Sequence, residues 1–518
     1  MMKKLSEHRY EILIGVLLLL GCLVRIVGIQ ALPQGLNCDE ASAGYEAFSL
    51  LNYGIDRNGN SFPVFLEAWG SGQNALYTYL MIPFVKCFGL NLLSTRLPMA
   101  LLSCLSLFVW YKMLLQIKGK KFAAIGLTFL AICPWHIMKS RWGLESNVFP
   151  DLVLWSVYFV MQFLLTQKPS RLYIAMGILA LTAYAYGTAY LFLPIFCVIL
   201  FVYLLVTKKI QFRQAFISFV IVAMIDLPIL GYLIINTFDL EQVSLGVITI
   251  PKLPVNRYEE QTSLFEGNVL LNVWQNFCHS VKLLVLQDDG LAWNQVSGYG
   301  MYYIVSVPFL IVGLVFCFKK NQLKNEFDTI INIWFGTAFL LLFALKEANI
   351  NRINVLIFPL IYYIVTGLHV VLLKKNRILA CVICLIYVLS FSGFLFAYCH
   401  AESENYWTFT DDVEDVIQYV NSLEKEIYFE YAFKEPYIYV LYYAQYDTKK
   451  FVETVEYFDE NHLGNFENVK GFGKYHFYLT ENWEGENVAY VIRKDTALGI
   501  DTSGFTVKEF EKYLVLEK

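Results

Sequence analysis

Charged residues are scarce in this sequence. Only 16% of its 518 residues are Asp, Glu, Lys or Arg, whereas 57% are hydrophobic. An ordinary soluble domain carries about 25% charged residues, so the composition indicates a polytopic membrane protein. The net charge of −4 is small and gives no reason to expect a nucleic-acid partner.

Motifs for metal binding, nucleotide hydrolysis and serine hydrolysis are also missing. The 7 His residues form no HxxxH or HExxH pattern, and the sequence has neither a Walker loop nor a GxSxG motif. Cys381 and Cys384 match CxxC, but they lie within an apolar run and have no flanking ligands. No residue cluster therefore requires a metal, and a divalent cation is kept only as a possible cofactor.

Long apolar runs are abundant, and runs of about 17–25 residues predict about eleven transmembrane helices. They cover residues 11–30, 95–117, 122–138, 147–166, 171–187, 188–207, 213–236, 301–318, 328–345, 353–373 and 378–398. Basic residues such as Lys118, Lys208 and Lys319 fall on alternate loops, on the same side as Lys3. The positive-inside rule then places the N terminus in the cytoplasm of a plasma-membrane protein.

This orientation predicts a transmembrane domain over 1–400 with two regions on the exterior, a first loop at 31–94 and a large loop at 237–300. Within the first loop, the amphipathic segment 73–88 is interrupted by Pro83 and is expected to lie in the membrane interface. The stretch 269–286 in the second region is similar.

The hydrophilic tail, 401–518, is expected outside the cell as a small soluble α/β domain. Residues 412–423 have helical spacing, and β-branched and aromatic residues predict strands. The predicted strands are 426–433, 475–479, 488–493 and 513–516.

An acidic pair, Asp39 and Glu40, follows the first apolar run. Asn37 before the pair is typical of a helix N-cap, and both carboxylates then occupy the first turn of a helix over 38–51. Capping explains the pair without any chemistry. Carboxylates at a membrane face are equally suited to activate a hydroxyl or to hold a cation, and both interpretations stay open from the pair alone.

Three groups of residues together resemble one family. The first is Leu23-Val24-Arg25, Asp39-Glu40-Ala41, Gly54-Ile55-Asp56-Arg57-Asn58-Gly59 and Thr95-Arg96-Leu97-Pro98; the second is Cys133-Pro134-Trp135-His136, Ser140-Arg141 and Glu145-Ser146-Asn147; the third is Asn351-Arg352 with Phe358-Pro359-Leu360. In this order they resemble the bacterial GT-C glycosyltransferases. These are the protein O-mannosyltransferase-like and aminoarabinose-transferase-like enzymes, which use polyprenyl-phosphate sugars.

The resemblance implies a GT-C-like fold and transfer of a hexose or pentose from a polyprenyl-phosphate donor to an acceptor hydroxyl on the exterior face. Asp39 matches the family's catalytic aspartate and is the expected general base, and Glu40 is expected to orient the acceptor or the base. Arg141 and Arg352 are expected to bind the donor phosphate.

Two further acidic residues are expected to support this chemistry. Glu145 follows Arg141 by four residues and is predicted to pair with it on one helical face. Asp289 is expected to contact the acceptor or a cation. Each has a plain structural alternative: a loop ion pair for Arg141 and Glu145, interfacial snorkelling for Arg352, and a solvated turn for Asp289.

A protein of another class, a transporter or flippase of lipid-linked sugars, is the main alternative. Transporters tend to show inverted repeats with polar residues at the bilayer midplane, whereas here no repeat is visible and charges gather at one exterior face. A glycan polymerase or ligase would share the donor and differ in the acceptor. The sequence leaves open whether the acceptor is a protein, a lipid or a cell-wall glycan.

Overall fold

The computed structural model describes residues 2–69, 72–254, 267–291, 293–296, 298–319, 325–373, 376–401, 410, 412–430, 435–458, 469–480, 483, 485–497 and 501–518. Contacts divide the chain into two compact units, and each is described by itself. Unit 1 comprises Met1–Val27, Met99–Leu227 and Tyr258–Ala401; unit 2 comprises Gly28–Pro98, Pro228–Arg257 and Glu402–Lys518.

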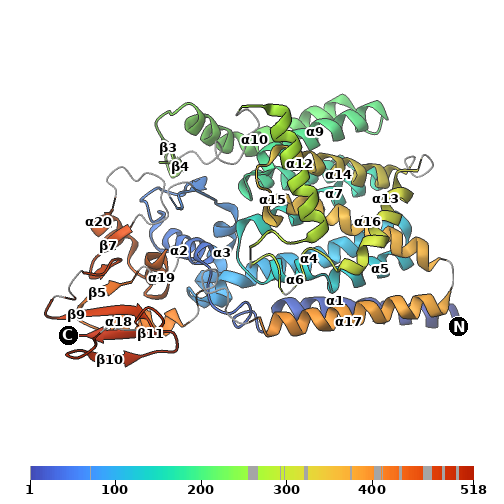
Figure 1. The fold of residues 1–518 in the computed structure, drawn as a ribbon. Helices are drawn as coiled ribbons and strands as arrows, with labels where there is room; N and C mark the ends of the chain where they lie inside the picture. The colour runs from blue at the N-terminus through green and yellow to red at the C-terminus, as the bar shows by residue number, and fades with distance from the viewer. Residues whose placement is uncertain are drawn as a thin grey trace. The chain divides into compact units, whose positions relative to one another are not determined.

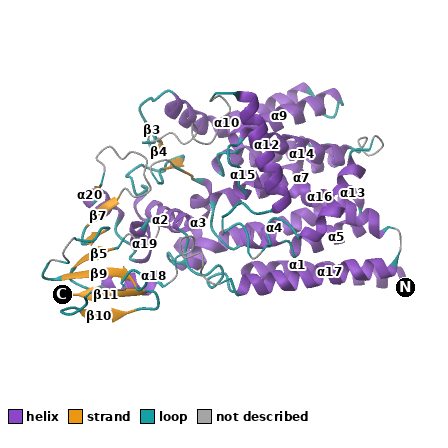
Figure 2. Ribbon diagram, in the orientation of Figure 1, coloured by secondary structure: helices purple, strands orange, loops and turns teal. Residues whose placement is uncertain are grey.

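Unit 1 consists of helices joined by loops (Figures 1 and 2), and short 3-10 helices also lie along its chain. Its elements are α1 (Met2–Ile26), α5 (Lys120–Ala131), α6 (Pro134–Ser140), η1 (Glu145–Asn147), α7 (Phe149–Thr166), α8 (Pro169–Ala180), η2 (Leu181–Tyr184), α9 (Ala189–Val206), α12 (Val269–Leu286), η4 (Ile304–Ser306), α13 (Val307–Cys317), α14 (Glu326–Ala344), α15 (Ile350–Ile353), η5 (Asn354–Leu356), α16 (Ile357–Leu372) and α17 (Arg377–Cys399). Helices α4 (Leu92–Lys118) and α10 (Phe212–Thr237) belong partly to each unit.

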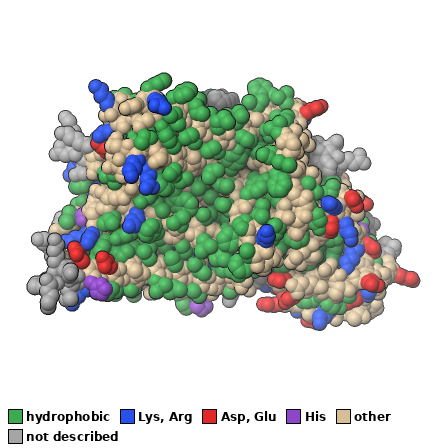
Figure 3. All heavy atoms as spheres, turned by 180° about the vertical axis from the view of Figure 1, so that it is seen from behind, with side chains coloured by type: hydrophobic (Ala, Val, Ile, Leu, Met, Phe, Trp, Pro, Cys, Tyr) green, Lys and Arg blue, Asp and Glu red, His purple; other side chains and the backbone are tan. Residues whose placement is uncertain are grey.

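Among the described helices, 8 are long and apolar enough to cross a membrane, or up to 9 when the pair α5 and α6 counts as one span bent by 57°. All of them except α12 coincide with apolar runs predicted from the sequence. The remaining predicted runs, 11–30, 171–187 and 301–318, are helical only in part, as α1, α8 and α13, and none of these three is among the helices long and apolar enough to cross. Hydrophobic side chains form a broad surface on the face shown in Figure 3, as expected of a multi-pass membrane protein whose outer helix faces meet lipid.

The sequence prediction differs from the structure at two of these helices. The stretch 269–286 was expected to resemble the interfacial segment 73–88, but α12 is long and apolar enough to cross. The run 122–138 was expected to be one straight helix, but it breaks before Pro134, because proline lacks the amide hydrogen that a continuous helix needs.

The centre of unit 1 depends on close contact between α13 and α16. A Cβ atom added at Gly313 would lie 1.8 Å from the carbonyl oxygen of Tyr363, and one added at Gly367 would lie 1.9 Å from that of Phe309. The two backbones therefore touch at paired glycines, as small residues allow in membrane helices. This contact holds α16, which follows the motif residues Asn351 and Arg352.

Unit 2 joins the first predicted exterior loop to the C-terminal tail. Its elements are α2 (Cys38–Tyr53), β1 (Phe65–Leu66), β2 (Gln73–Asn74), α3 (Leu76–Phe88), β3 (Val243–Leu245), β4 (Ile248–Ile250), α18 (Val413–Asn421), β5 (Glu426–Phe429), α19 (Pro436–Tyr443), α20 (Thr448–Thr454), β6 (Glu456–Tyr457), β7 (Val469–Phe472), β8 (Tyr475–His476), β9 (Val488–Arg493), β10 (Thr506–Glu509) and β11 (Tyr513–Glu517). Helix α3 has 13 residues and contains Pro83, in agreement with the prediction of a helix too short to span.

The tail forms a mixed sheet in the order β10-β11-β9-β5-β8-β7-β6, in which β5 runs parallel to both β9 and β8. The predicted helix and strands are present as α18, β5, β8, β9 and β11, which confirms the α/β prediction. The end of the strand predicted over 426–433 lies outside the described residues, because 431–434 are among those not described.

Helix α19 packs on α2 within unit 2. The Tyr442 hydroxyl lies 2.7 Å from the Thr95 hydroxyl, and the Tyr45 hydroxyl donates to the Tyr446 carbonyl at 2.7 Å. The tail and the first loop therefore share one folded unit, although the sequence suggested a boundary at residue 400.

Candidate active site

The acidic pair begins α2, as the sequence predicted. Asn37 is the N-cap: its side-chain oxygen accepts from the Asp39 amide at 2.8 Å, and the Glu40 carboxylate accepts from the Asn37 amide at 3.2 Å. These contacts form a capping box, which satisfies amide groups that a helix start leaves without partners. The two neighbouring carboxylates then have very different surroundings.

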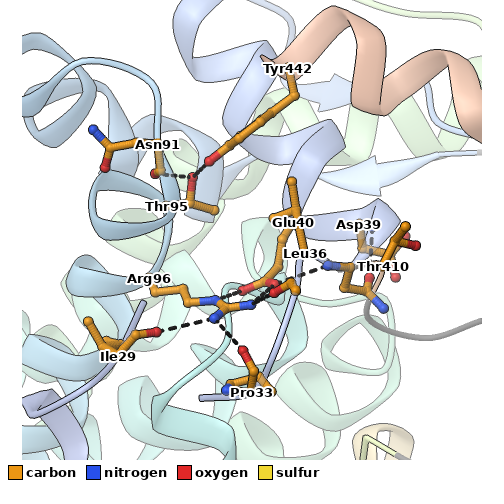
Figure 4. Close-up of polar contacts among 12 residues, drawn as sticks. Ile29, Pro33, Leu36, Asp39, Glu40, Asn91, Thr95, Arg96, Thr410 and Tyr442 are labelled. Atoms are coloured by element: carbon orange, nitrogen blue, oxygen red, sulfur yellow. Dashed lines mark hydrogen bonds and ion pairs between the residues drawn. The ribbon is translucent and has the colours of Figure 1, made fainter. Parts of the chain in front are cut away.

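Glu40 is fully buried in an ion pair with Arg96 (Figure 4). The guanidinium donates to both carboxylate oxygens, from Nε at 2.9 Å and from Nη2 at 2.8 Å. Arg96 also donates to the carbonyls of Ile29 at 3.1 Å and Pro33 at 2.9 Å. Through Arg96, Glu40 thus holds the chain before α2. Its predicted role, orienting the acceptor or the base, stays a prediction.

Asp39 is half-buried, unlike Glu40. Its Oδ1 atom accepts a hydrogen bond from the Trp69 indole nitrogen at 2.8 Å. Within the described part of the chain, Oδ2 accepts no hydrogen bond. The carboxylate is thus fixed through one oxygen and presents the other, which is a geometry suited to accept a proton.

A second buried ionic cluster lies farther along α2. Arg57 pairs with Glu46 at 3.4 Å, and both side chains are almost fully buried. Burial raises the pKa of Glu46 to about 8 and that of Glu67 to about 7, and it also raises the pKa of Asp56. Three carboxyl groups around one guanidinium cannot all ionise cheaply without water, so the upward direction follows from desolvation.

Arg141 lies in unit 1 and is nearly buried, with 3% of its surface exposed. Its Nη1 atom donates to the carbonyls of Val24 and Val27, both at 2.9 Å. The cation therefore caps the C-terminal end of α1, where it also meets the negative end of the helix dipole. Its predicted role at the donor phosphate stays a prediction.

The shared helical face predicted for Arg141 and Glu145 is absent, whereas their pairing stays a prediction. Helix α6 ends at Ser140, and Glu145 begins the separate turn η1. The four-residue spacing therefore does not place the two side chains on one helical face, because the chain between them is not helical.

Arg352 and Asp289 come close in unit 1 through α15. The Asp289 carboxylate accepts from the Ile350 amide at 2.9 Å and from the Asn294 side chain at 2.7 Å. Arg352 is half-buried and donates through Nη1 to the Lys346 carbonyl at 3.0 Å. Asp289 thus holds the short helix that carries Arg352. Arg352 donates only through Nη1, so its Nε and Nη2 atoms make no hydrogen bond among the described residues.

The motif groups within unit 1 also contact one another. The Arg25 Nε atom donates to His136 Nδ1 at 3.0 Å, which joins the first group to the second. The Asn354 side chain donates to the Ser146 carbonyl at 2.7 Å, next to the third group. Residues far apart in the sequence are therefore in contact within unit 1.

No cation site emerges from the residues that the structure describes, since they contain no group of three or more His, Cys, Asp or Glu side chains placed to hold a metal ion.

The sequence analysis missed two buried ion pairs, Arg96 with Glu40 and Arg57 with Glu46. Both arginines stood within the first motif group, and a cation next to the apolar residues of that group was the available signal for a buried ion pair. Trp69 stood in no motif, and its contact with Asp39 spans 30 residues of sequence.

Comparison with known proteins gives no match by sequence and several by structure. No protein-family model matches the chain, and no curated protein matches it significantly. A crystal structure of ArnT from Cupriavidus metallidurans bound to undecaprenyl phosphate is similar, with a TM-score of 0.61 and 11% identity over 97% of this chain and 97% of that chain.

Crystal structures of an oligosaccharyltransferase from Archaeoglobus fulgidus are also similar. One, in complex with Zn and sulfate, has a TM-score of 0.52 and 12% identity over 83% of this chain. Another, tethered to an acceptor peptide, has a TM-score of 0.51 and 12% identity over 84% of this chain. The match covers only 61% and 63% of those longer chains.

These similarities, together with the helical membrane region and the C-terminal sheet, define the class of protein by its fold. The chain has the fold of the GT-C glycosyltransferases. The resemblance inferred from the motif groups is thereby confirmed at the level of the fold.

Proposed function

We propose that this protein is a membrane glycosyltransferase that moves a hexose or pentose from a polyprenyl-phosphate donor to an acceptor hydroxyl, with Asp39 as the general base. The observation that carries the proposal is the contrast within the acidic pair. Glu40 is fully buried and paired with Arg96, whereas Asp39 is half-buried and fixed through Oδ1 alone. If Asp39 only helped to cap α2, it would not require the hydrogen bond from Trp69 to its Oδ1 atom.

The chemistry assigned to Asp39 balances without a cofactor. The acceptor oxygen forms a bond to C1 of the sugar, and its proton passes to Asp39 Oδ2. The bond between C1 and the phosphate oxygen breaks, and polyprenyl phosphate leaves. A correctly placed general base contributes about 10²–10⁴-fold to such a step.

The leaving phosphate needs a cation, and Arg352 fits that need better than Arg141. Arg352 is half-buried and uses one guanidinium nitrogen for the carbonyls before α15. Arg141 is nearly buried and donates to the end of α1. A guanidinium with two remaining donors can bind a phosphate through two hydrogen bonds.

The fold supports the donor class. The similar ArnT structure is described as bound to undecaprenyl phosphate, and a polyprenyl-phosphate sugar is the donor that we assign here by that similarity. We place the reaction on the exterior face, with the N terminus in the cytoplasm and residues 401–518 outside the cell, because the basic loops follow the positive-inside rule.

The test is sugar transfer by the purified protein in lipid nanodiscs from a panel of radiolabelled polyprenyl-phosphate sugars. Asp39→Asn keeps the shape of the side chain and should lower the rate about 10²–10⁴-fold, without changing the melting temperature. Asp501→Asn, an equal change at an exposed position of the tail, is the matched control. Near-normal transfer by Asp39→Asn would refute the assignment of the base.

A flippase gives a different result in the same preparation. A flippase would move labelled lipid between leaflets without forming a glycosidic bond. Asp39→Asn would then not separate lipid movement from bond formation. A polymerase or ligase would form the bond but only with a glycan acceptor, so the acceptor panel should include a peptide, a lipid and a cell-wall glycan.

A further inference from the structure

The hydrogen bond between Trp69 and Asp39 belongs to a larger arrangement on one face of α2. Asp39, Ser42 and Glu46 are spaced by three and four residues, so they lie on the same face of this helix. Arg57 reaches two of them: its Nη1 atom donates to the Ser42 hydroxyl at 2.8 Å, and its Nε atom lies 3.4 Å from the Glu46 carboxylate. Arg57 therefore lies along the helix face that carries the proposed base.

Arg57 also packs against the ring of Trp69. The guanidinium carbon lies 5.5 Å from the centre of the Trp69 ring and 6.0 Å from that of Tyr437. The Tyr437 ring, from α19, meets Trp69 edge to face at 6.2 Å. A desolvated cation over an aromatic face attracts the ring strongly and limits its tilt. The indole is held from two sides, and its nitrogen points to Asp39.

The backbone at Trp69 supports the same conclusion. Its φ angle is 55°, in the left-handed region that a bulky side chain rarely adopts. Such a conformation is strained and persists where the surrounding structure enforces it. The indole is 8% exposed and reaches Asp39 from this strained position.

We propose that Trp69 and Arg57 are positioning residues for the base: Arg57 and Tyr437 fix the Trp69 ring, and the indole N–H holds Oδ1 of Asp39 so that Oδ2 faces the acceptor hydroxyl. This inference rests on the proposed function. It adds that the tail, through Tyr437, is a structural part of the active site rather than only an exterior module.

The experiment measures Asp39 directly as well as through turnover. Carbodiimides label protonated carboxyl groups, so the pH midpoint of Asp39 labelling, read by peptide mass spectrometry, needs no donor or acceptor. Trp69→Phe keeps an aromatic ring and removes the N–H that stabilises the ionised carboxylate. We expect the midpoint to rise by about one pH unit, the value of one hydrogen bond to a charged group.

Turnover is the second measurement, and we expect it to fall. In Trp69→Phe we expect kcat to fall about tenfold at neutral pH with little change in acceptor KM, because a misdirected base slows proton transfer without weakening binding. The charged neighbours are unchanged in this variant: Glu40 remains paired with Arg96, and Glu46 with Arg57. Trp483→Phe, the same substitution in the tail, is the matched control and should leave both quantities unchanged.

Each outcome decides the proposal. A labelling midpoint that does not move in folded Trp69→Phe overturns it, whatever the rate does. A raised midpoint in a preparation where even the wild type transfers no sugar would keep the positioning of Asp39 and refute the proposed function instead. If Trp69→Phe does not fold, benzothienylalanine at residue 69 keeps the size of the indole and replaces only the N–H, and the same midpoint is measured.

Discussion

Glu40 and Arg96 near the start of α2, and Arg352 in α15, all occupy motif positions, yet their surroundings differ. In the α2 region (28–69 together with Arg96), Glu40 and Arg96 are fully buried, and the guanidinium donates to several carbonyls at once. In the α15 region (287–296 and 346–353), Asp289 holds a helix of four residues and Arg352 stays half-buried. The first region is held by a buried ion pair, whereas in the second the Asp289 carboxylate and the Asn349 side chain accept hydrogen bonds from the backbone of α15.

This difference suggests a division of labour. A general base must be placed within a few tenths of an ångström, and a buried, fully bonded frame provides that precision. A phosphate-binding cation has a longer reach and must also release a lipid product, so a partly exposed arginine on a short helix is suited to it. The same residue type, arginine, is therefore expected to matter for folding in one region and for donor binding in the other.

The largest expected effect is on stability, at Arg96. Arg96→Met should lower the free energy of unfolding by about 3–5 kcal/mol, because it leaves the buried Glu40 carboxylate without its cation. Arg352→Met makes the same chemical change in the α15 region and should alter the melting temperature little. Melting of the two variants in the same detergent tests the contrast, and equal melting temperatures would contradict it.

In donor kinetics, replacing Arg352 should have a larger effect than replacing Arg96, the reverse of their order in stability. Arg352→Met should raise the KM for the polyprenyl-phosphate donor about tenfold, the effect of losing roughly 1.4 kcal/mol of phosphate binding. Arg352→Lys should recover part of this loss, because it restores the charge but not the paired hydrogen bonds. Arg377→Ala, at an exposed helix start, is the control for charge removal, and an unchanged donor KM in Arg352→Met would exclude the residue from the donor site.

The sequence predicted the helices well because lipid imposes simple rules on length and polarity. Strand β9 (Val488–Arg493) was also predicted with its correct ends, since its β-branched and aromatic run is uninterrupted. The prediction was poorer where distant contacts decide the structure. Trp69, which donates to Asp39, has a left-handed backbone angle and contacts a tyrosine more than 360 residues away in the chain, and no local pattern encodes either feature.

The smallest expected effect concerns Glu67, at the edge of the α2 region. Its pKa is raised by burial from 4.5 to about 7 in the folded protein. Between these two values the folded protein keeps a proton that the unfolded chain releases, so the stability contributed by this group is complete below pH 4.5 and is lost as the pH rises through 7. Glu67→Gln cannot ionise, and it should melt a few degrees above the wild type at pH 8 but at the same temperature near pH 4.5.

The comparison for this prediction is Glu453→Gln in α20, whose carboxylate is exposed and whose replacement should leave the melting curve unchanged at both pH values. Part of the pH dependence should survive in Glu67→Gln, because burial also raises the pKa of Glu46 to about 8. If Glu67→Gln and wild type melt together at pH 8, then Glu67 ionises without cost, and the α2 region is more hydrated around Arg57 than the buried pairs indicate. In that case the buried ionic frame of the region would consist of Glu40 and Arg96 alone. The position of the Trp69 ring would then depend more on Tyr437 than on Arg57.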